Sequence, residues 1–166
     1  LGTVPISAAG ELAPFTPERM WQLQRIGAPD VSPDGRFAVA AVSRFDMAEN
    51  KAYSNIWQWD TATGAARQLT SRNVSDGSPL VSPDGRRMAF VSQREGDTAP
   101  QIYLLPLDGG EPQRLTSVAT GVAQPKWFPD GTRIAFLSRV WADLDTSAKQ
   151  AERLKERTDA KMQAQV

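Results

Sequence analysis

The residues that most often carry hydrolytic chemistry are missing from this sequence of 166 residues. It has no histidine, so the usual general base for an activated serine and the commonest zinc ligand are both absent. It has no cysteine, which excludes disulfides and thiolate metal sites. The sequence contains no Gly-x-Ser-x-Gly segment, the sharp turn that presents a nucleophilic serine in α/β-hydrolases. We therefore predict no catalytic, cofactor-binding or metal-binding residue here, and no cofactor.

Three aspartates, Asp34, Asp84 and Asp130, each stand between a proline and a glycine. Asp-Gly pairs also occur in calcium-binding loops, but those loops need alternating acidic ligands closed by a glutamate, and that spacing is missing. In a tight turn the proline presets φ, the aspartate accepts hydrogen bonds from nearby backbone amides, and the glycine adopts positive φ at little cost. The three segments are therefore interpreted as hairpin turns.

Four tryptophans and one run of charges are the remaining candidates for a binding surface. Indole rings give large contact areas, so Trp57, Trp59, Trp127 and Trp141 are candidates to line a ligand site. For Trp57 and Trp127, which fall in predicted strands, packing between neighbouring sheets is the favoured interpretation. Trp141 is left open between a central axis and a neighbouring domain. The charged run 152–157 is interpreted as a solvated helix face, with a partner contact as the alternative.

The balance of charges narrows the range of partners. The chain has 19 Lys and Arg against 19 Asp and Glu, so it lacks the basic excess of nucleic-acid-binding proteins. Its apolar runs all fall well short of the roughly 20 residues that a membrane-spanning helix needs. We predict no nucleic-acid partner and no membrane span.

The predicted turns mark an internal repeat. Their aspartates are separated by 50 and 46 positions, close to the roughly 40 to 45 residues of a four-stranded propeller blade. A second pattern recurs in step with the turns, because residues 55–70 and 101–116 both carry an Ile-aromatic pair near their start and end in Leu-Thr. Self-similarity of this period is typical of a propeller or a solenoid.

Each repeat has the strand content of a propeller blade. An apolar run follows each turn, at 37–42, 88–91 and 134–137, and suits a strand buried on both faces. A bulky strand and a short outer strand come next in the first two repeats. The first run is one residue longer before its serine, which predicts a β-bulge there. The predicted fold is all-β, a partial β-propeller of four-stranded antiparallel blades with a short N-terminal helix and a C-terminal helical excursion.

Both ends of the chain depart from the repeat. Thr16 as N-cap, Pro17 at the first helical position and Gly27 as a stop predict a helix over 17–26. Residues 145–166 lack Gly and Pro and are rich in helix formers, which predicts a helical insertion at about 145–161. The predicted domains are an N-terminal extension with the lead-in helix, 1–24, and a partial propeller, 25–166, with repeats at about 25–75, 76–121 and 122–166.

The repeats supply only two blades and the opening of a third, whereas a propeller buries its inner edges with about 4 to 8 blades. We therefore expect these residues to be a part of a longer protein. Exposed blade faces of this kind also favour association into oligomers.

The Ser-Pro-Asp-Gly turn followed by an apolar strand resembles the WD40-like propeller repeat of two families. These are the serine peptidases of the prolyl oligopeptidase family and the periplasmic translocation protein TolB, and the resemblance covers about residues 25–140. The segments Val42-Ser43-Arg44-Phe45-Asp46 and Ser138-Arg139-Val140-Trp141 are similar to the acylaminoacyl and dipeptidyl peptidase branch. The glutamate pair that grips a substrate amino terminus in dipeptidyl peptidases has no counterpart in this sequence.

The peptidase resemblance implies a non-catalytic role. In that family the propeller caps a C-terminal α/β-hydrolase domain, which carries the catalytic residues, and limits entry to small peptides. The implied partners are that hydrolase domain and a short or N-acylated peptide substrate. The alternative is a TolB-like interaction propeller of the cell envelope. A propeller-based polysaccharide lyase, a third hypothesis, needs metal-binding histidines that this sequence lacks.

The compartment is predicted from the small-residue segment Ser7-Ala8-Ala9-Gly10 and from the habits of the resembling families. Small residues of this kind occur near signal-peptidase cleavage sites. The expectation is a periplasmic or secreted protein, and a cytoplasmic protein is the alternative.

Overall fold

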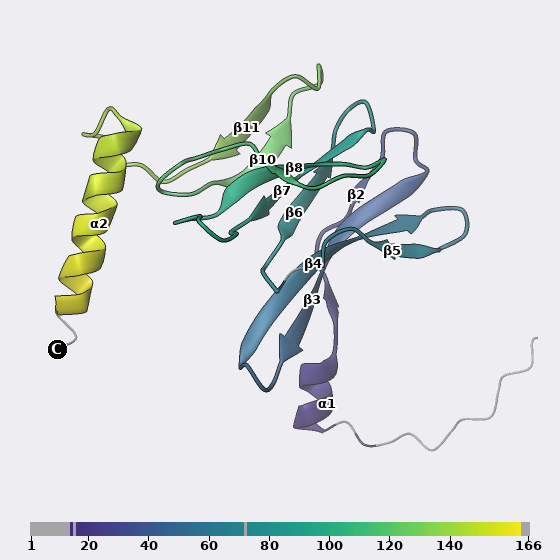
Figure 1. Ribbon diagram of the computed structural model, residues 1–166. Coiled ribbons are helices and arrows are strands. Elements are labelled where there is room, and N and C mark those ends of the chain that lie inside the picture. Colours follow the sequence, from purple (N-terminus) through teal and green to yellow (C-terminus); the bar gives the residue numbers. More distant parts are fainter. Residues whose placement is uncertain (1–13, 15, 72, 164–166) are drawn as a thin grey trace, which may run out of the picture.

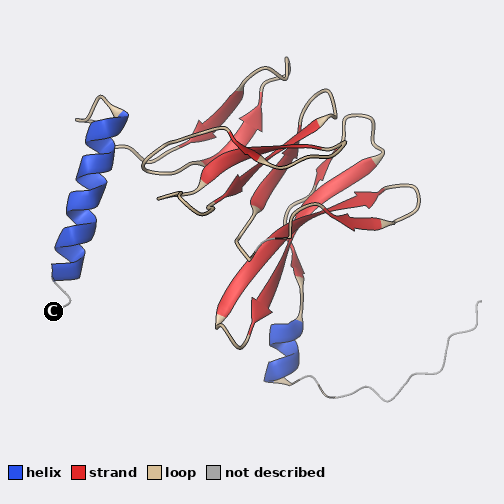
Figure 2. Cartoon of the chain, in the orientation of Figure 1, coloured by secondary structure: helices blue, strands red, loops and turns tan. Residues whose placement is uncertain are grey.

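The computed structural model describes residues 14, 16–71 and 73–163, so the segment Ser7–Gly10 lies outside the described residues. Strands dominate it, and they form three separate antiparallel sheets that fan out side by side (Figures 1 and 2). The elements are α1 (Pro17–Gln22), β1 (Arg25–Ile26), β2 (Asp30–Val31), β3 (Phe37–Asp46), β4 (Lys51–Asp60), β5 (Ala66–Gln68), β6 (Gly77–Val81), β7 (Arg87–Ser92), β8 (Gln101–Pro106), β9 (Gln113–Arg114), β10 (Ala123–Trp127), β11 (Ile134–Leu137) and α2 (Ser147–Gln163).

The sheets follow the predicted blade plan. The second sheet has the order β6-β7-β8-β9, four strands in sequence order, and the first has the order β1-β3-β4-β5 with β2 also paired to β3. The third sheet holds only β10 and β11 among the described residues. The fold is therefore a partial β-propeller whose sheets do not close into a ring, as the repeats predicted.

The first sheet contains a long hairpin that corrects one prediction. Strands β3 and β4 pair without a register shift from Phe37 opposite Asp60 to Asp46 opposite Lys51. The bulge predicted before Ser43 is therefore wrong. The extra residue is accommodated because both strands continue past the blade body to the turn at 47–50, so the pairing keeps its register.

The β-bulges lie instead at the start of the inner strand of the second and third sheets. The register shifts between Gly77 and Leu80 in one sheet and between Ala123 and Lys126 in the other. Ser78 and Gln124, which precede Pro79 and Pro125, adopt positive φ of 49° and 48°. An extra residue in a left-handed conformation bends the strand, and proline removes a backbone donor there, so both bulges arise from one local arrangement.

The core lies between the first two sheets. Val39 and Ile56 of the first sheet pack with Met88 and Phe90 of the second, and all four are fully buried. Burial of each such side chain contributes about 1.5–3 kcal/mol. A second cluster joins the second sheet to the third, and Trp127 packs against it while its Nε1 donates to the carbonyl of Leu80 at 3.2 Å. Packing between sheets is thus confirmed for Trp127.

The N-terminal helix is shorter than predicted. Thr16 caps α1, accepting a hydrogen bond from the amide of Arg19 as expected, but the helix ends at Gln22 rather than Ile26. Arg25 and Ile26 form β1 and pair with Ser43 and Val42. The unpaired edge of β3 offers backbone hydrogen bonds that a further helical turn would forgo, so the chain extends before Gly27.

Helix α2 follows the third sheet and is anchored by a buried glutamine. The Gln150 side chain, 6% exposed, accepts from the amide of Trp141 at 2.9 Å and donates to the carbonyls of Trp141 and Leu144 at 2.8 Å. Trp141 is half-buried, with the guanidinium of Arg157 5.9 Å from its ring centroid. The tryptophan left open by the sequence therefore lies against α2. No helix among the described residues has the length and apolar character to cross a membrane.

We expect Gln150→Ala to loosen α2 without unfolding the sheets. The substitution leaves the amide of Trp141 and two carbonyls without their partner, a cost of about 1–3 kcal/mol in local stability. Hydrogen exchange should therefore accelerate over 141–163 and remain unchanged in β7 and β8. The control is Lys155→Ala, at an exposed position of the same helix, which should leave both regions unchanged.

Candidate functional site

The turn aspartates act inside their own turns. Asp34 accepts from the Ser32 hydroxyl at 2.7 Å and from the amide of Arg36 at 3.1 Å, and the second turn repeats this pattern. In the third turn, where phenylalanine replaces the serine, Asp130 accepts from the amide of Thr132 at 3.0 Å. Nowhere in the described part of the chain do three or more acidic residues gather as a metal site. These contacts support the interpretation of the aspartates as turn residues.

The same hydrogen bonds make the turns sensitive to acid. The Ser32 hydroxyl and then the Arg36 amide hold the pKa of Asp34 below the ordinary value of 3.8. The pKa of Asp84 and that of Asp130 are lowered in the same way by their own turn donors. A depressed pKa in the folded chain means that the stabilisation is present above the ordinary value and is lost as pH falls through the lowered pKa.

We therefore expect the free energy of unfolding to decline below about pH 4 because the unfolded chain binds these protons more readily. Urea denaturation at a series of pH values measures the slope. Replacing Asp34, Asp84 and Asp130 together by asparagine should flatten that slope. An unchanged slope in the triple variant would assign the acid sensitivity to other carboxyls.

Two pockets occupy equivalent places in successive repeats. The first, of about 580 Å³, lies between the first and second sheets, and the other, also about 580 Å³, lies between the second and third. Four residues of each pocket hold equivalent repeat positions. They are Ser54, Ser75, Ser78 and Ser92 in the first pocket and, in the same order, Pro100, Gly121, Gln124 and Ser138 in the other. The bulge residues with positive φ therefore line both pockets.

The first pocket differs from its counterpart by a buried acid and base. Asp76 is fully buried, and its Oδ1 lies 3.9 Å from Nη2 of Arg94, whose side chain is 10% exposed. The guanidinium carbon of Arg94 lies 4.6 Å from the ring centroid of Tyr103. Four polar atoms here are buried without a hydrogen-bond partner in the described part of the chain: both carboxylate oxygens of Asp76, the hydroxyl of Ser92 and Nε of Arg94.

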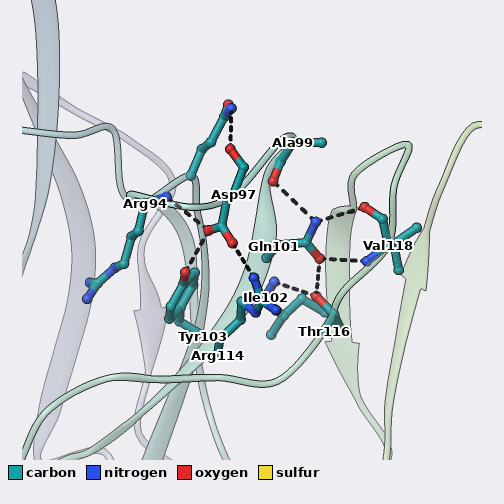
Figure 3. A network of polar contacts seen from close by, with 10 residues as sticks. Arg94, Asp97, Ala99, Gln101, Ile102, Tyr103, Arg114, Thr116 and Val118 are labelled. Atoms are coloured by element: carbon teal, nitrogen blue, oxygen red, sulfur yellow. Dashed lines mark hydrogen bonds and ion pairs between the residues drawn. The ribbon is translucent and has the colours of Figure 1, made fainter. Parts of the chain in front are cut away.

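Asp97 forms a saturated network beside this pair (Figure 3). Its carboxylate accepts from the Tyr103 hydroxyl at 2.6 Å, the Arg94 amide at 3.0 Å and Nη1 of Arg114 at 2.8 Å. Burial alone would raise the pKa of Asp97, but these donors outweigh it and hold the pKa below its ordinary value. Burial, together with the bond to Asp97, raises the pKa of Tyr103 to about 12. The network orders the loop between β7 and β8, and with it Arg94.

Gln101 makes a second network that connects β8 to the segment after β9. Its Nε2 donates to the carbonyl of Val118 at 2.8 Å, and its Oε1 accepts from the Thr116 hydroxyl at 2.8 Å (Figure 3). The same threonine accepts from the amide of Ile102 at 2.9 Å, and Thr70 does so for Ile56 in the first repeat. The recurring Leu-Thr thus has a structural role, because its hydroxyl fastens the outer edge of each blade.

Buried polar atoms without partners among the described residues set the first pocket apart from its counterpart. A hydrolytic serine needs a base within hydrogen-bond reach, and the sequence has no histidine to supply one. Sequence reasoning missed Asp76 and Arg94, although the repeat held a signal. The signal is that Asp76 and Arg94 replace apolar residues, because the third repeat has Val122 and Val140 at the same distances from its turn aspartate.

Comparison with known families identifies the repeat. Residues 22–161 match the family described as PD40, the TolB beta propeller domain. The chain belongs to this family. The match covers both pockets and all three sheets, and it ends within α2.

The curated relatives of this propeller domain are much longer than the chain. Peptidase YuxL of Bacillus subtilis is 41% identical over 93 residues, which cover 56% of this chain and 14% of the relative. Dipeptidyl-peptidase 5 of Porphyromonas gingivalis is 34% identical over 82 residues, which cover 49% of this chain and 12% of the relative. The chain therefore corresponds to a small part of the length of each.

Solved structures show the same fold. The acylaminoacyl peptidase of Pyrococcus horikoshii matches with a TM-score of 0.62 at 18% identity, over 78% of this chain and 20% of that one. A TolB of Agrobacterium tumefaciens matches with a TM-score of 0.57 at 28% identity, over 74% of this chain and 41% of that one. This chain therefore shares its fold with a part of each of these proteins.

Proposed function

We propose that this chain is the N-terminal propeller portion of a serine peptidase that acts on short or N-acylated peptides. The catalytic serine, aspartate and histidine would lie in an α/β-hydrolase domain outside these residues. The observation that carries the proposal is the 41% identity to a protein named a peptidase, supported by the 34% identity to a dipeptidyl-peptidase. Both are several times longer than the segment they share with this chain, which leaves room for such a domain.

The proposed role of the propeller is steric. The long β3–β4 hairpin, the loop between β7 and β8, and α2 all follow the second strand of a blade, and so project at one rim. Three such projections around one opening would restrict a hydrolase domain packed above them to small peptides. The partners proposed are that domain and its peptide substrate, in the periplasm or outside the cell.

A gate of this kind predicts a dependence on substrate length. The full-length protein should cleave an N-acetylated tripeptide anilide about tenfold or more faster, by kcat/KM, than the same tripeptide anilide extended at its amino end to about 30 unstructured residues. An active site without steric restriction would cleave the short and the long substrate with similar kcat/KM. Equal kcat/KM for the two lengths would therefore contradict the gating role while leaving the peptidase assignment in place.

The second candidate is an interaction propeller of the TolB type. The family itself and the 28% identity to a TolB protein favour it. In that case the full-length protein would consist of further blades and would hydrolyse neither substrate.

A further inference from the structure

Only the second repeat has both an aspartate and an arginine at two particular positions of the repeat. The other two repeats have at least one apolar residue at these positions. Asp76 stands eight residues before its turn aspartate and Arg94 ten residues after it. The third repeat has Val122 and Val140 at these positions. The first has Ile26 in place of the acid, so its arginine, Arg44, pairs elsewhere, with Asn73 at 2.9 Å.

Stability does not account for this acid and base. A buried ion pair is costly to desolvate, and replacing one by well-packed apolar residues is often neutral or stabilising. Here Oδ1 of Asp76 and Nη2 of Arg94 are 3.9 Å apart, and four polar atoms of the cluster have no hydrogen bond to any residue that the structure describes. Each buried unpaired polar group costs about 1–3 kcal/mol.

The equivalent pocket shows what a satisfied version looks like. Ser138, at the repeat position of Ser92, donates to the carbonyl of Gly121 at 2.6 Å and lies 2.9 Å from the hydroxyl of Thr120. Ser92 makes no such contact within residues 16–71 and 73–163, although it lines a pocket of the same volume. The atoms without hydrogen-bond partners are therefore a feature of the pocket between the first and second sheets and are not shared by every blade.

The unsatisfied atoms define the chemistry of a complementary group. The two oxygens of Asp76 need N–H donors, whereas Nε of Arg94 needs an acceptor. The pair has no net charge, so an ammonium or a carboxylate group would be attracted by one member and repelled by the other, with no net electrostatic gain. A neutral amide offers N–H donors and a carbonyl acceptor on one planar group and meets both needs.

We propose that the pocket between the first and second sheets binds an amide-bearing peptide segment through Asp76, Ser92 and Arg94. Ser92 and Arg94 line the pocket directly. Asp76 does not line the pocket itself: it is fully buried, follows Ser75 and precedes Gly77, which both line the pocket, and its Oδ1 lies 3.9 Å from Nη2 of Arg94. The proposed binding therefore requires the Arg94 side chain to move so that the amide reaches the carboxylate. Binding here needs no hydrolase chemistry, so the inference stands apart from the proposed peptidase activity.

The test uses the full-length protein and N-acetylglycinamide as the probe. Titration followed by saturation-transfer NMR should show saturable binding, and acetate and methylammonium should each bind about tenfold more weakly. The double variant D76V/R94V copies the valines of the third repeat, so it should remain folded and lose the probe about tenfold or more in affinity. The matched control is Ser138→Ala in the equivalent pocket, which should bind the probe as the unaltered protein does.

Three results would overturn the inference. They are no saturable binding of the amide, unchanged affinity in the double variant, or tighter binding of either charged probe. If the double variant does not fold, Ser92→Ala provides the same decision, because losing this hydroxyl should weaken the amide several-fold and an unchanged affinity would contradict the site. None of these measurements depends on the cleavage of peptide anilides. A failure of the binding proposal can therefore be distinguished from a failure of the peptidase proposal.

Discussion

Replacing Arg94 alone by alanine should lower the free energy of unfolding by about 3–5 kcal/mol, because the substitution leaves a buried carboxylate without the cation that lies beside it among the described residues. Asp76 is fully buried and has no hydrogen bond to its carboxylate oxygens among the described residues. The substitution also removes the guanidinium from the face of Tyr103. Urea denaturation of the same chain measures the loss.

The double variant D76V/R94V provides the control for this prediction. Removing both charges relieves the desolvation cost, so most of the stability lost in Arg94→Ala should return. A loss below about 1 kcal/mol in the single variant would mean that Asp76 is compensated by some other group. That result would remove the physical reason for treating the pocket as a binding site.

Phe90→Ala should be comparably destabilising, by about 3–5 kcal/mol, because it opens a cavity at the centre of the core. Phe90 is fully buried between the first two sheets and lies 5.9 Å from Tyr103, measured between ring centroids. Its large loss of stability should appear as a lower urea midpoint with little change in slope.

Phe136 provides a matched control, since it holds the same position in the third repeat and is 38% exposed. Phe136→Ala should cost no more than about 1 kcal/mol in this chain. In the full-length protein the cost should approach that of Phe90→Ala, because a following blade would cover the third sheet. Equal, small costs in both settings would contradict a continuing propeller.

The sequence allowed the blade plan to be predicted because its signals are local. Each of these signals determines the structure of residues close to it in the sequence. They are the Pro-Asp-Gly turns, the apolar run after each turn, and the Leu-Thr at the outer strand. Trp127 was placed between sheets on the same grounds, and its packing is confirmed. The packing of Trp57 between sheets stays a prediction, since it is half-buried on β4.

What escaped prediction depends on contacts between segments. The helix α1 stops early because β3 offers an edge for pairing, which no local pattern reveals. One bulge was expected, before Ser43, and the two observed bulges were missed, although Pro79 and Pro125, each five residues before a turn aspartate, were available as a signal. The pairing of Asp76 with Arg94 depends on which strands are neighbours, so only a position-by-position comparison of the repeats indicates it.

The measurement that tests the central proposal most directly is labelling of the full-length protein with a fluorophosphonate probe, together with its mass. The proposal predicts a protein several times the length of this chain that is labelled on a single serine outside residues 1–166. A full-length protein built only of further blades and left unlabelled would contradict the peptidase assignment and favour the interaction propeller.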